Sequence, residues 1–354
     1  MMISLKYREF SIFEIGDVFD VGTGGLVSRK DLKAGDTPRI SAKDQDNGID
    51  GFYRHISINS YKEFHNFISV SFLGTTFYHP YTASLDMKIH SLHLKNRELN
   101  PQIARFIITM LTMTTKRKFS YGNQLSSAIL PLQKIMLPIS LEDAMPDWQF
   151  MEQYIIEREQ LQLEEYVAHA KNVLAEIGDV ENVLPLREKD WKPFVLSSIF
   201  ILETGRGKGL NHLTQTTDGI SYLGATNRNN GVLCFVKPID KLVQRGNGIA
   251  FIRNGEGSIG YSVYKAEPFI ASSDLTIGYS DKLNLYTGLF ITTIADTVRG
   301  KYNFNYKRSE KRLSKEFLNL PIDNDGKPDW IYMEQYVKYV IKNQICDYLL
   351  YRNK

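Results

Sequence analysis

The strongest constraint on this chain is a phrase that it contains twice. Residues 146–154 read PDWQFMEQY and residues 328–336 read PDWIYMEQY, so the copies lie 182 residues apart in a chain of 354. Chance is a poor explanation for matching Trp, Met and Tyr positions. A repeat at about half the chain length predicts two similar units, each with its own core.

Weaker matches extend the repeat upstream of each phrase. They pair 10–25 with 191–209, 45–53 with 228–236, 81–89 with 269–277, 115–123 with 300–308 (298–306 at a constant offset) and 129–139 with 312–322. The offset drifts, as insertions in surface loops would cause. We therefore divide the chain into a first domain at 1–145, a helix at 146–178, a second domain at 179–327 and a second helix at 328–354.

Each domain is expected to be a mixed α+β unit with antiparallel-rich sheets. Short aromatic and β-branched runs bounded by Gly, Asn, Pro or Ser predict strands, for example at 67–74, 248–255, 261–267 and 275–280. Helices are expected at 103–115 and 285–298.

Each repeated phrase opens a segment that predicts a long helix. Residues 147–177 contain no Gly or Pro, Asp147 is a suitable N-cap, and Gly178 is a suitable stop. About 31 helical residues would span roughly 45 Å. Two readings remain open. Each helix covers its own domain, or the two helices pack as an antiparallel coiled-coil spacer with pseudo-two-fold symmetry.

Apolar side chains with heptad-like spacing define the expected contact faces of these helices. The residues expected at a helix or partner interface are Trp148, Met151, Tyr154, Leu163, Val167, Ala170, Leu174, Trp330, Met333, Tyr336, Val337, Val340 and Ile341.

Composition indicates an ordinary globular protein, with 43% hydrophobic and 23% charged residues. No apolar run approaches the roughly 18 residues of a membrane span. The N-terminus lacks a signal-peptide core, and Cys234 and Cys346 form no pairing pattern. We expect a cytoplasmic protein. The net charge is only +3, but residues 147–177 hold two Lys or Arg against seven Asp or Glu, so the basic excess lies in the domains.

Three motifs that suggest chemistry have simpler explanations. GEGSIG at 255–260 matches a dinucleotide motif, but a strand-like segment follows where a helix is required, which favours a β-turn. GRGKG at 205–209 lacks phosphate-loop spacing. HSLH at 90–93 has no third ligand nearby, so no metal site is expected. The sequence displays no catalytic constellation.

Basic and aromatic residues alternate in one segment of the second domain. Between Arg299 and Arg312 six Lys or Arg stand against one acid, Glu310, and 116–124 is the first-domain counterpart. Cations neutralise phosphates, while Arg, Asn and Gln read base edges. An ordinary charged surface turn is the open alternative. The residues expected to bind DNA are Thr23, Lys43, Lys116, Arg117, Lys118, Tyr121, Asn123, Arg206, Lys208, Asn227, Arg228, Arg253, Arg299, Lys301, Tyr302, Asn303, Asn305, Lys307 and Arg308.

The motif LPI followed by PDW-x-(F/Y)-ME-x-Y stands at 137–154 and again at 320–336. In carrying it twice, the chain resembles the specificity subunits of type I restriction–modification systems. It resembles still more the separate specificity subunit of type IIB, BcgI-like enzymes. The resemblance covers essentially the whole chain and rests on scaffold motifs.

This resemblance implies two target-recognition domains, each reading one half of a bipartite, asymmetric target in double-stranded DNA. The helices would set the spacing between the halves and dock a methyltransferase/endonuclease subunit. S-adenosylmethionine and Mg²⁺ are then expected in that partner, and this chain is expected to be a non-catalytic recognition subunit without cofactor.

Two other classes remain open from the residues alone. One is a nucleic-acid-processing enzyme that acts alone, such as a nuclease, which would require a carboxylate cluster. The other is an adaptor whose tandem domains bind proteins, and its binding would be insensitive to salt.

Overall fold

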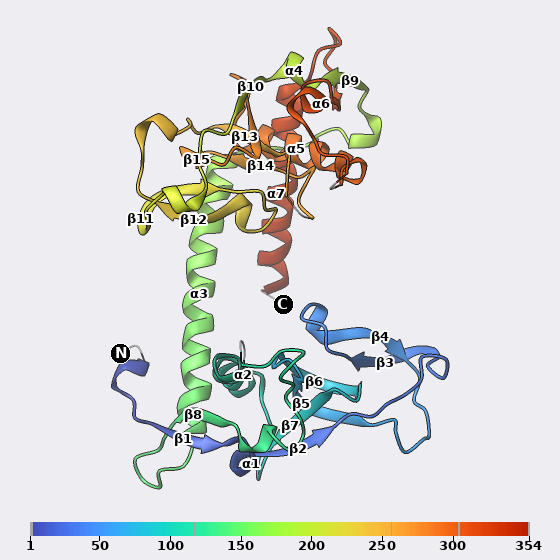
Figure 1. Ribbon diagram of the computed structural model, residues 1–354, viewed down its shortest axis with the longest axis vertical. Helices are drawn as coiled ribbons and strands as arrows, with labels where there is room; N and C mark the ends of the chain where they lie inside the picture. Colours follow the sequence, from blue (N-terminus) through green and yellow to red (C-terminus); the bar gives the residue numbers. More distant parts are fainter. Residues whose placement is uncertain (1–2, 116–117, 256, 304, 353–354) are drawn as a thin grey trace. The chain divides into compact units, whose positions relative to one another are not determined.

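The computed structural model describes residues 3–115, 118–255, 257–303 and 305–352 (Figure 1). The chain divides into two compact units, Met1–Tyr166 and Val167–Lys354, and each is described by itself. Both contain an antiparallel-rich sheet and a helix packed against it, so the expected mixed α+β class is confirmed. No helix in the described ranges is long and apolar enough to cross a membrane.

Unit 1 is built on a six-stranded sheet with the order β2-β7-β5-β6-β3-β4. Only β3 and β6 run parallel; the other neighbours are antiparallel. Strands β1 and β8 form a separate antiparallel pair, and the short helix α1 directly follows β1 in the sequence. The bounds are β1 Phe10–Glu14, α1 Ile15–Val18, β2 Phe19–Thr23, β3 Ala34–Ile40, β4 Ile49–Tyr53, β5 Glu63–Ser71, β6 Thr76–Leu85, β7 Ile89–Leu94 and β8 Lys134–Pro138.

Helix α2 (Pro101–Thr115) covers the core of this sheet. Its residues Ile103, Ile107 and Leu111 are fully buried and share one cluster with side chains of β5 and β7. Their spacing of four residues places them on one face of the helix. Asn100 caps α2, because its Oδ1 accepts the amide hydrogen of Ile103 at 2.8 Å. The helix predicted at 103–115 is confirmed.

Unit 2 repeats these elements in the same order, with one break. Its strands form a four-stranded sheet, β10-β16-β13-β14, a three-stranded sheet, β12-β11-β15, and the pair β17-β9. The bounds are β9 Trp191–Val195, α4 Leu196–Ile199, β10 Ile201–Thr204, β11 Gln215–Leu223, β12 Val232–Val236, β13 Gly248–Ile252, β14 Ser262–Lys265, β15 Phe269–Ala271, β16 Leu275–Tyr279, α5 Leu285–Ala295, α6 Glu310–Ser314 and β17 Phe317–Pro321.

The break falls where unit 1 has the continuous strand β6. That strand pairs with β5 and then with β3, whereas in unit 2 the same pairings are made by β14 and by β15. Pro268 lies between β14 and β15. Pro80 stands at the equivalent place inside the continuous strand β6, so Pro268 does not account for the two sheets of unit 2.

Matching turns confirm the repeat at the level of single residues. Asn47 and Gly48 precede β4 with φ of 52° and 74°, and Asn230 and Gly231 precede β12 with φ of 51° and 77°. Positive φ is tolerated chiefly by glycine and asparagine, so the pair Asn-Gly recurs for a structural reason. The predicted match of 45–53 with 228–236 is therefore correct.

Two long helices, α3 (Trp148–Ile177) and α7 (Trp330–Arg352), begin at the repeated phrase. Asp147 caps α3 by accepting the amide hydrogen of Phe150 at 2.9 Å, and Asp329 caps α7 in the same way. The capping carboxylates also pair with cations near the start of their own copies, Arg8 and Lys189. The predicted N-cap at Asp147 is confirmed, and Gly178 ends α3 with φ of 70°.

The first turn of each long helix is anchored in the domain that precedes it. Met151 and Met333 are fully buried in the cores of units 1 and 2. Trp148 and Trp330 are partly buried against the same cores. These methionines therefore hold the helices on their own domains and are not available to a partner protein.

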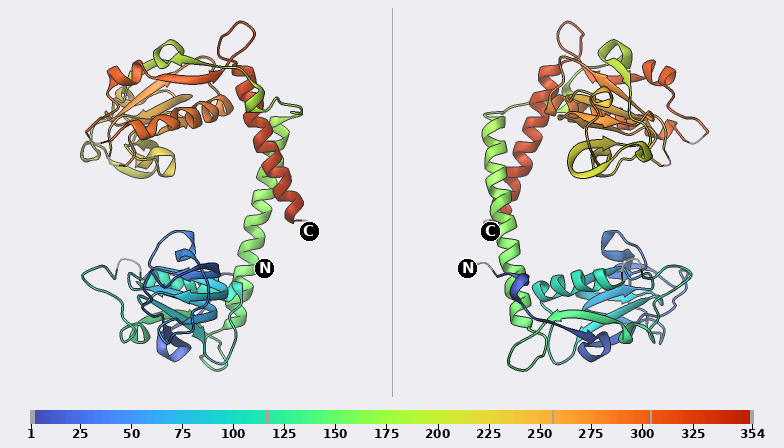
Figure 2. Two further views of the ribbon diagram at one scale, coloured as in Figure 1. Left: turned by 90° about the vertical axis from the view of Figure 1, so that its right-hand side faces the viewer. Right: turned by 60° about the vertical axis from the view of Figure 1, so that its left-hand side comes forward.

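The end of α3 packs against α7 inside unit 2. Val173 and Ile177 share an apolar cluster with Val337 and Ile341 of α7, and the two helices run antiparallel there (Figure 2). Ala170 is buried, but Leu163, Val167 and Leu174 are partly exposed. Antiparallel pairing of the helices was one of the two readings left open by the sequence, but the contact includes Val173, which was not among the predicted contact residues.

We expect Met151→Ala to lower the free energy of unfolding of unit 1 by about 2–5 kcal/mol, because the change leaves a cavity in a closed core. The control is Met145→Ala, since Met145 is 58% exposed. Urea-dependent hydrogen exchange of unit 1 peptides would measure both. Equal stabilities of the two variants would contradict the anchoring of α3 by Met151.

A second prediction concerns His79 of β6, which is fully buried and contacts Ser69 Oγ through Nε2 at 2.9 Å. Burial lowers the pKa of His79 from 6.5 to about 4. The neutral form thus stabilises the fold above pH 6.5, and this contribution is lost as the pH falls towards 4. Between pH 8 and pH 4, wild type should lose about 3 kcal/mol more than His79→Gln. Identical pH profiles in the same exchange measurement would refute this.

Candidate nucleic-acid interface

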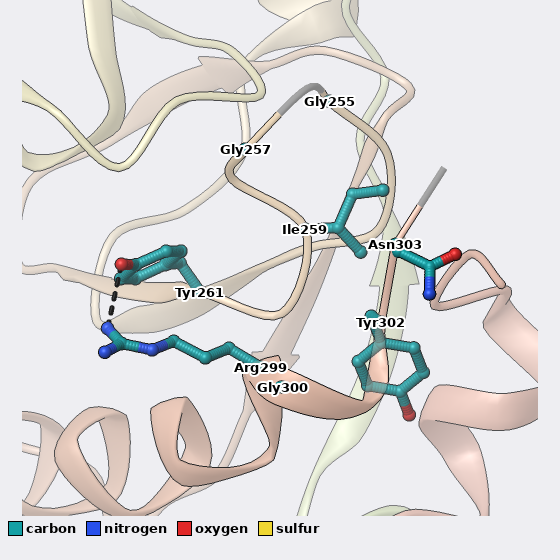
Figure 3. A pocket seen from close by; sticks show the side chains of 8 residues that line it. All are labelled: Gly255, Gly257, Ile259, Tyr261, Arg299, Gly300, Tyr302 and Asn303. Atoms are coloured by element: carbon teal, nitrogen blue, oxygen red, sulfur yellow. Dashed lines mark hydrogen bonds between the residues drawn. The ribbon is translucent and has the colours of Figure 1, made fainter. Parts of the chain in front are cut away.

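A pocket of about 470 Å³ opens on unit 2 between two segments that are distant in sequence (Figure 3). One wall is the loop between β13 and β14, with Gly255, Gly257, Ile259 and Tyr261. The other wall follows α5 and consists of Arg299, Gly300, Tyr302 and Asn303. The structure thus brings three of the predicted DNA-binding residues together at one site.

The second wall starts in a short 3₁₀ helix, Asp296–Lys301, which is fixed to strand β14. Asp296 accepts hydrogen bonds from the amide of Ser262 at 2.8 Å and from its hydroxyl at 2.7 Å. Burial raises the pKa of the Asp296 carboxyl. This contact holds the backbone on both sides of the pocket, because Tyr261 and Arg299 lie close in sequence to the two partners.

Arg299 lines the pocket, and its side chain runs towards Tyr261 (Figure 3). Its Nη1 donates to the hydroxyl of Tyr261 at 2.8 Å, and its guanidinium carbon lies 5.0 Å from the centroid of that ring (Figure 3). The arginine side chain is exposed. A guanidinium held in this way keeps several donors for a ligand with little further loss of freedom.

A small hairpin carries the next polar residues. The backbone amides and carbonyls of Asn303 and Tyr306 exchange hydrogen bonds at 3.2 and 3.1 Å. Asn303 Oδ1 accepts from the amides of Asn305 and Tyr306, and the Tyr306 ring stacks on Tyr302 at 6.0 Å. Asn303, Asn305 and Lys301 are exposed, as expected for residues that contact a ligand.

Arg308 contradicts the prediction that it contacts DNA. Its side chain is fully buried, and it forms an ion pair with the buried carboxylate of Glu316. Nη1 donates to the carbonyl of Gly260 at 3.1 Å. Tyr302 donates its hydroxyl to the same carboxylate at 2.7 Å, and burial, together with Glu316, raises the pKa of Tyr302. The charge-rich sequence suggested a surface, but a nearby carboxylate pairs this cation inside the domain.

Unit 1 has the corresponding hairpin at Ser120 and Asn123, which exchange backbone hydrogen bonds. Lys116 and Arg117 lie outside the described residues. Lys118 is exposed and donates to Gln133 Oε1 at 2.5 Å. Tyr121 is 78% exposed, and Asn123 donates to the carbonyl of Lys118 at 3.1 Å. The hairpins match at a constant offset of 183, so 298–306 is the correct counterpart of 115–123.

The other predicted DNA-binding residues lie in separate segments of the two units. Lys208, Asn227, Arg228 and Lys307 are exposed. Arg206 pairs with Glu203 and Lys43 pairs with Asp46, while Arg253 donates to the carbonyl of Ser273 at 2.6 Å and Thr23 contacts His90 at 3.3 Å. Thr23 and Arg253 are also partly buried, which leaves less of their side chains for a contact with DNA.

Sequence reasoning missed the loop at 255–261 and Glu316. The GEGSIG segment was correctly assigned to a turn, but not to a site. A signal for Glu316 existed, since it stands at the place of Gln133 in the repeat. Among residues the structure describes, no group of three or more His, Cys, Asp or Glu could hold a metal ion.

The remaining predicted interface residues of the two long helices pack against different parts of the protein. Tyr154 packs on the core of unit 1, and Tyr336 and Val337 pack on that of unit 2. Val340, with Leu289 and Ile294 of α5, lines an apolar groove of about 240 Å³ in unit 2.

Comparison with known proteins agrees with this architecture. A family model described as the type I restriction modification DNA specificity domain matches residues 7–167 and again 188–347. The specificity subunit S.BcgI of a type II restriction enzyme from Heyndrickxia coagulans is 27% identical over 343 residues, covering 93% of this chain and 94% of that protein.

A solved structure shares the fold. The S subunit of a type I restriction–modification system from M. genitalium superposes with a TM-score of 0.57 at 13% identity, covering 98% of this chain and 94% of that one. The two family matches include both units and most of each long helix. The chain therefore belongs to the type I restriction modification DNA specificity family and carries two tandem copies of its domain.

Proposed function

We propose that this chain is the DNA-specificity subunit of a restriction–modification complex, and that each domain reads one half of a bipartite, asymmetric target. One observation carries the proposal: the two domains share a scaffold but present different residues on the same hairpin. Asn303 and Tyr306 stand where the first domain has Ser120 and Asn123. A shared scaffold with different exposed residues suits two different half-sites.

Exposed cations supply the attraction to the DNA backbone in this proposal. Lys118 and Lys301 occupy equivalent positions next to the two hairpins, and both are exposed. Such residues neutralise phosphates without regard to sequence. The exposed amides and Arg299 then supply donors and acceptors for base edges.

The long helices would act as the spacer between the half-sites. Helix α3 has 30 residues, and a helix of this length spans about 45 Å, slightly more than the roughly 35 Å of one DNA turn. The acidic composition of residues 147–177 suits a protein partner better than DNA.

In this assignment the chain is non-catalytic, and a separate subunit carries out methylation and cleavage. That methyltransferase/endonuclease subunit would bring S-adenosylmethionine and Mg²⁺. The name of S.BcgI, a specificity subunit of a restriction enzyme, supports this division of labour.

The first test is selection of bound duplexes from randomised double-stranded DNA by the full-length chain. We expect two different short sequences separated by a fixed gap. Enrichment of a single continuous sequence, or of none, would refute the proposed function, and metal-dependent cleavage by the purified chain would show an enzyme instead.

Insertion of four residues after Ala168, about one helical turn, tests the spacer. Ala168 is an exposed residue of α3. The gap between the half-sites should change while both half-site sequences stay the same, because the insertion leaves both domains intact. Altered half-site sequences with an unchanged gap would rule out a spacer role for α3.

Lys301→Ala and Lys118→Ala test the phosphate contacts. Each variant should lower the magnitude of the slope of log K against log [salt] by about 0.9, since one phosphate contact is removed. Lys327→Ala is the matched control, because Lys327 is an exposed lysine in the turn before α7. Slopes equal to that of Lys327→Ala would exclude Lys301 and Lys118 from the backbone contacts.

A further inference from the structure

A single buried ion pair holds both walls of the pocket in unit 2. Arg308 donates to Glu316 and to the carbonyl of Gly260, which belongs to the loop wall. Glu316 in turn accepts from Tyr302 on the opposite wall. The walls also touch directly, because a Cβ on Gly260 would lie 2.6 Å from the Cα of Arg299. The pocket is thus preorganised by contacts beneath it.

The first domain folds without this ion pair. At the constant offset of 183, Leu125, Gln133 and Phe119 stand in the places of Arg308, Glu316 and Tyr302. Leu125 is 2% exposed and Gln133 is 8% exposed, so these positions are buried in both domains. The scaffold therefore does not require a charge here.

A buried ion pair is seldom the most stable choice for a core, because the loss of hydration offsets much of the attraction. Its benefit is geometric: a guanidinium fixes the directions of several hydrogen bonds at once. Here those bonds run to Gly260 and, through Glu316, to Tyr302. The ion pair is explained by the shape of the pocket rather than by the stability of the domain.

The lining suits the edge of a base better than a phosphate. Arg299 lies along an aromatic ring with its remaining donors unused by the contact with Tyr261. Ile259, Tyr302 and the Asn303 side chain complete a surface that is partly apolar. A phosphate would gain nothing from apolar walls, whereas a paired set of guanidinium donors matches O6 and N7 of guanine.

We propose that this pocket reads one guanine-containing base pair in the half-site of the second domain, with Arg299 contacting the base and with Arg308 and Glu316 as positioning residues. The inference rests on the proposed function and adds to it the identity of a specificity-determining residue. The first domain lacks the positioning pair and reads its half-site by other contacts.

Arg299→Lys in the full-length chain tests the contact with the base. Lysine keeps the charge but loses the paired donors. Selection from randomised duplexes should show the preference for guanine at one position of one half-site falling roughly 5- to 150-fold. The other half-site and the salt slope should stay as in wild type. Retained preference at every position would overturn the inference, and a uniform loss of affinity would indicate a phosphate contact instead.

The positioning pair is tested by transplanting the first domain's residues. The triple variant Arg308→Leu, Glu316→Gln and Tyr302→Phe recreates a set that folds in unit 1. It should lose preference at the position affected by Arg299→Lys, while the half-site of the first domain is unchanged. Wild-type selectivity in a folded triple variant would refute positioning by the ion pair. If this variant does not fold, the proposal is judged by the Arg299→Lys variant, because Arg299 is on the surface.

The experiments distinguish a failure of the proposed function from a failure of the base contact assigned to Arg299. If wild type enriches no bipartite sequence, the proposed function and this inference both fail. If wild type enriches two half-sites and Arg299→Lys changes neither, only the inference fails.

Discussion

Closure of each domain by its own helix is the constraint on which the rest of the structure depends. One carboxylate both caps the helix and pairs with a cation near the start of the same copy, and one methionine fills the core beneath the first turn. The phrase at 146–154 and 328–336 is therefore repeated because it solves the same packing problem twice. Because these contacts join each helix to its own domain, the loops and hairpins of the two domains can differ without loss of the scaffold.

Local signals in the sequence predicted the scaffold well. The helix cap at Asp147 and the stop at Gly178 depend on residues within a few positions of one another, and both were found where expected. The contact between α3 and α7 was predicted less well. The spacing of the apolar residues in α3 is compatible with more than one contact face of the helix. In the structure Val173 rather than Leu174 enters the cluster shared with α7.

The candidate site was harder to predict because it depends on contacts between distant segments. Arg299 and Tyr261 are 38 residues apart and meet only because β14 lies against α5 and the turn after it. The burial of Arg308 was missed for another reason. A run of charged residues indicates a surface unless the partner of each charge is known, and Glu316 reaches Arg308 only through the fold.

The closure of each copy has a consequence for the history of the gene. In each copy the capping ion pair and the buried core around the methionine come from one continuous stretch of chain, from the cation before the first strand to the methionine in the helix. A single duplication of that stretch would yield two self-sufficient modules at once. The two copies differ beneath the hairpin, where unit 2 has the buried ion pair of Arg308 and Glu316 and unit 1 has Leu125 and Gln133. Divergence of the two surfaces thus required no compensating change across the molecule.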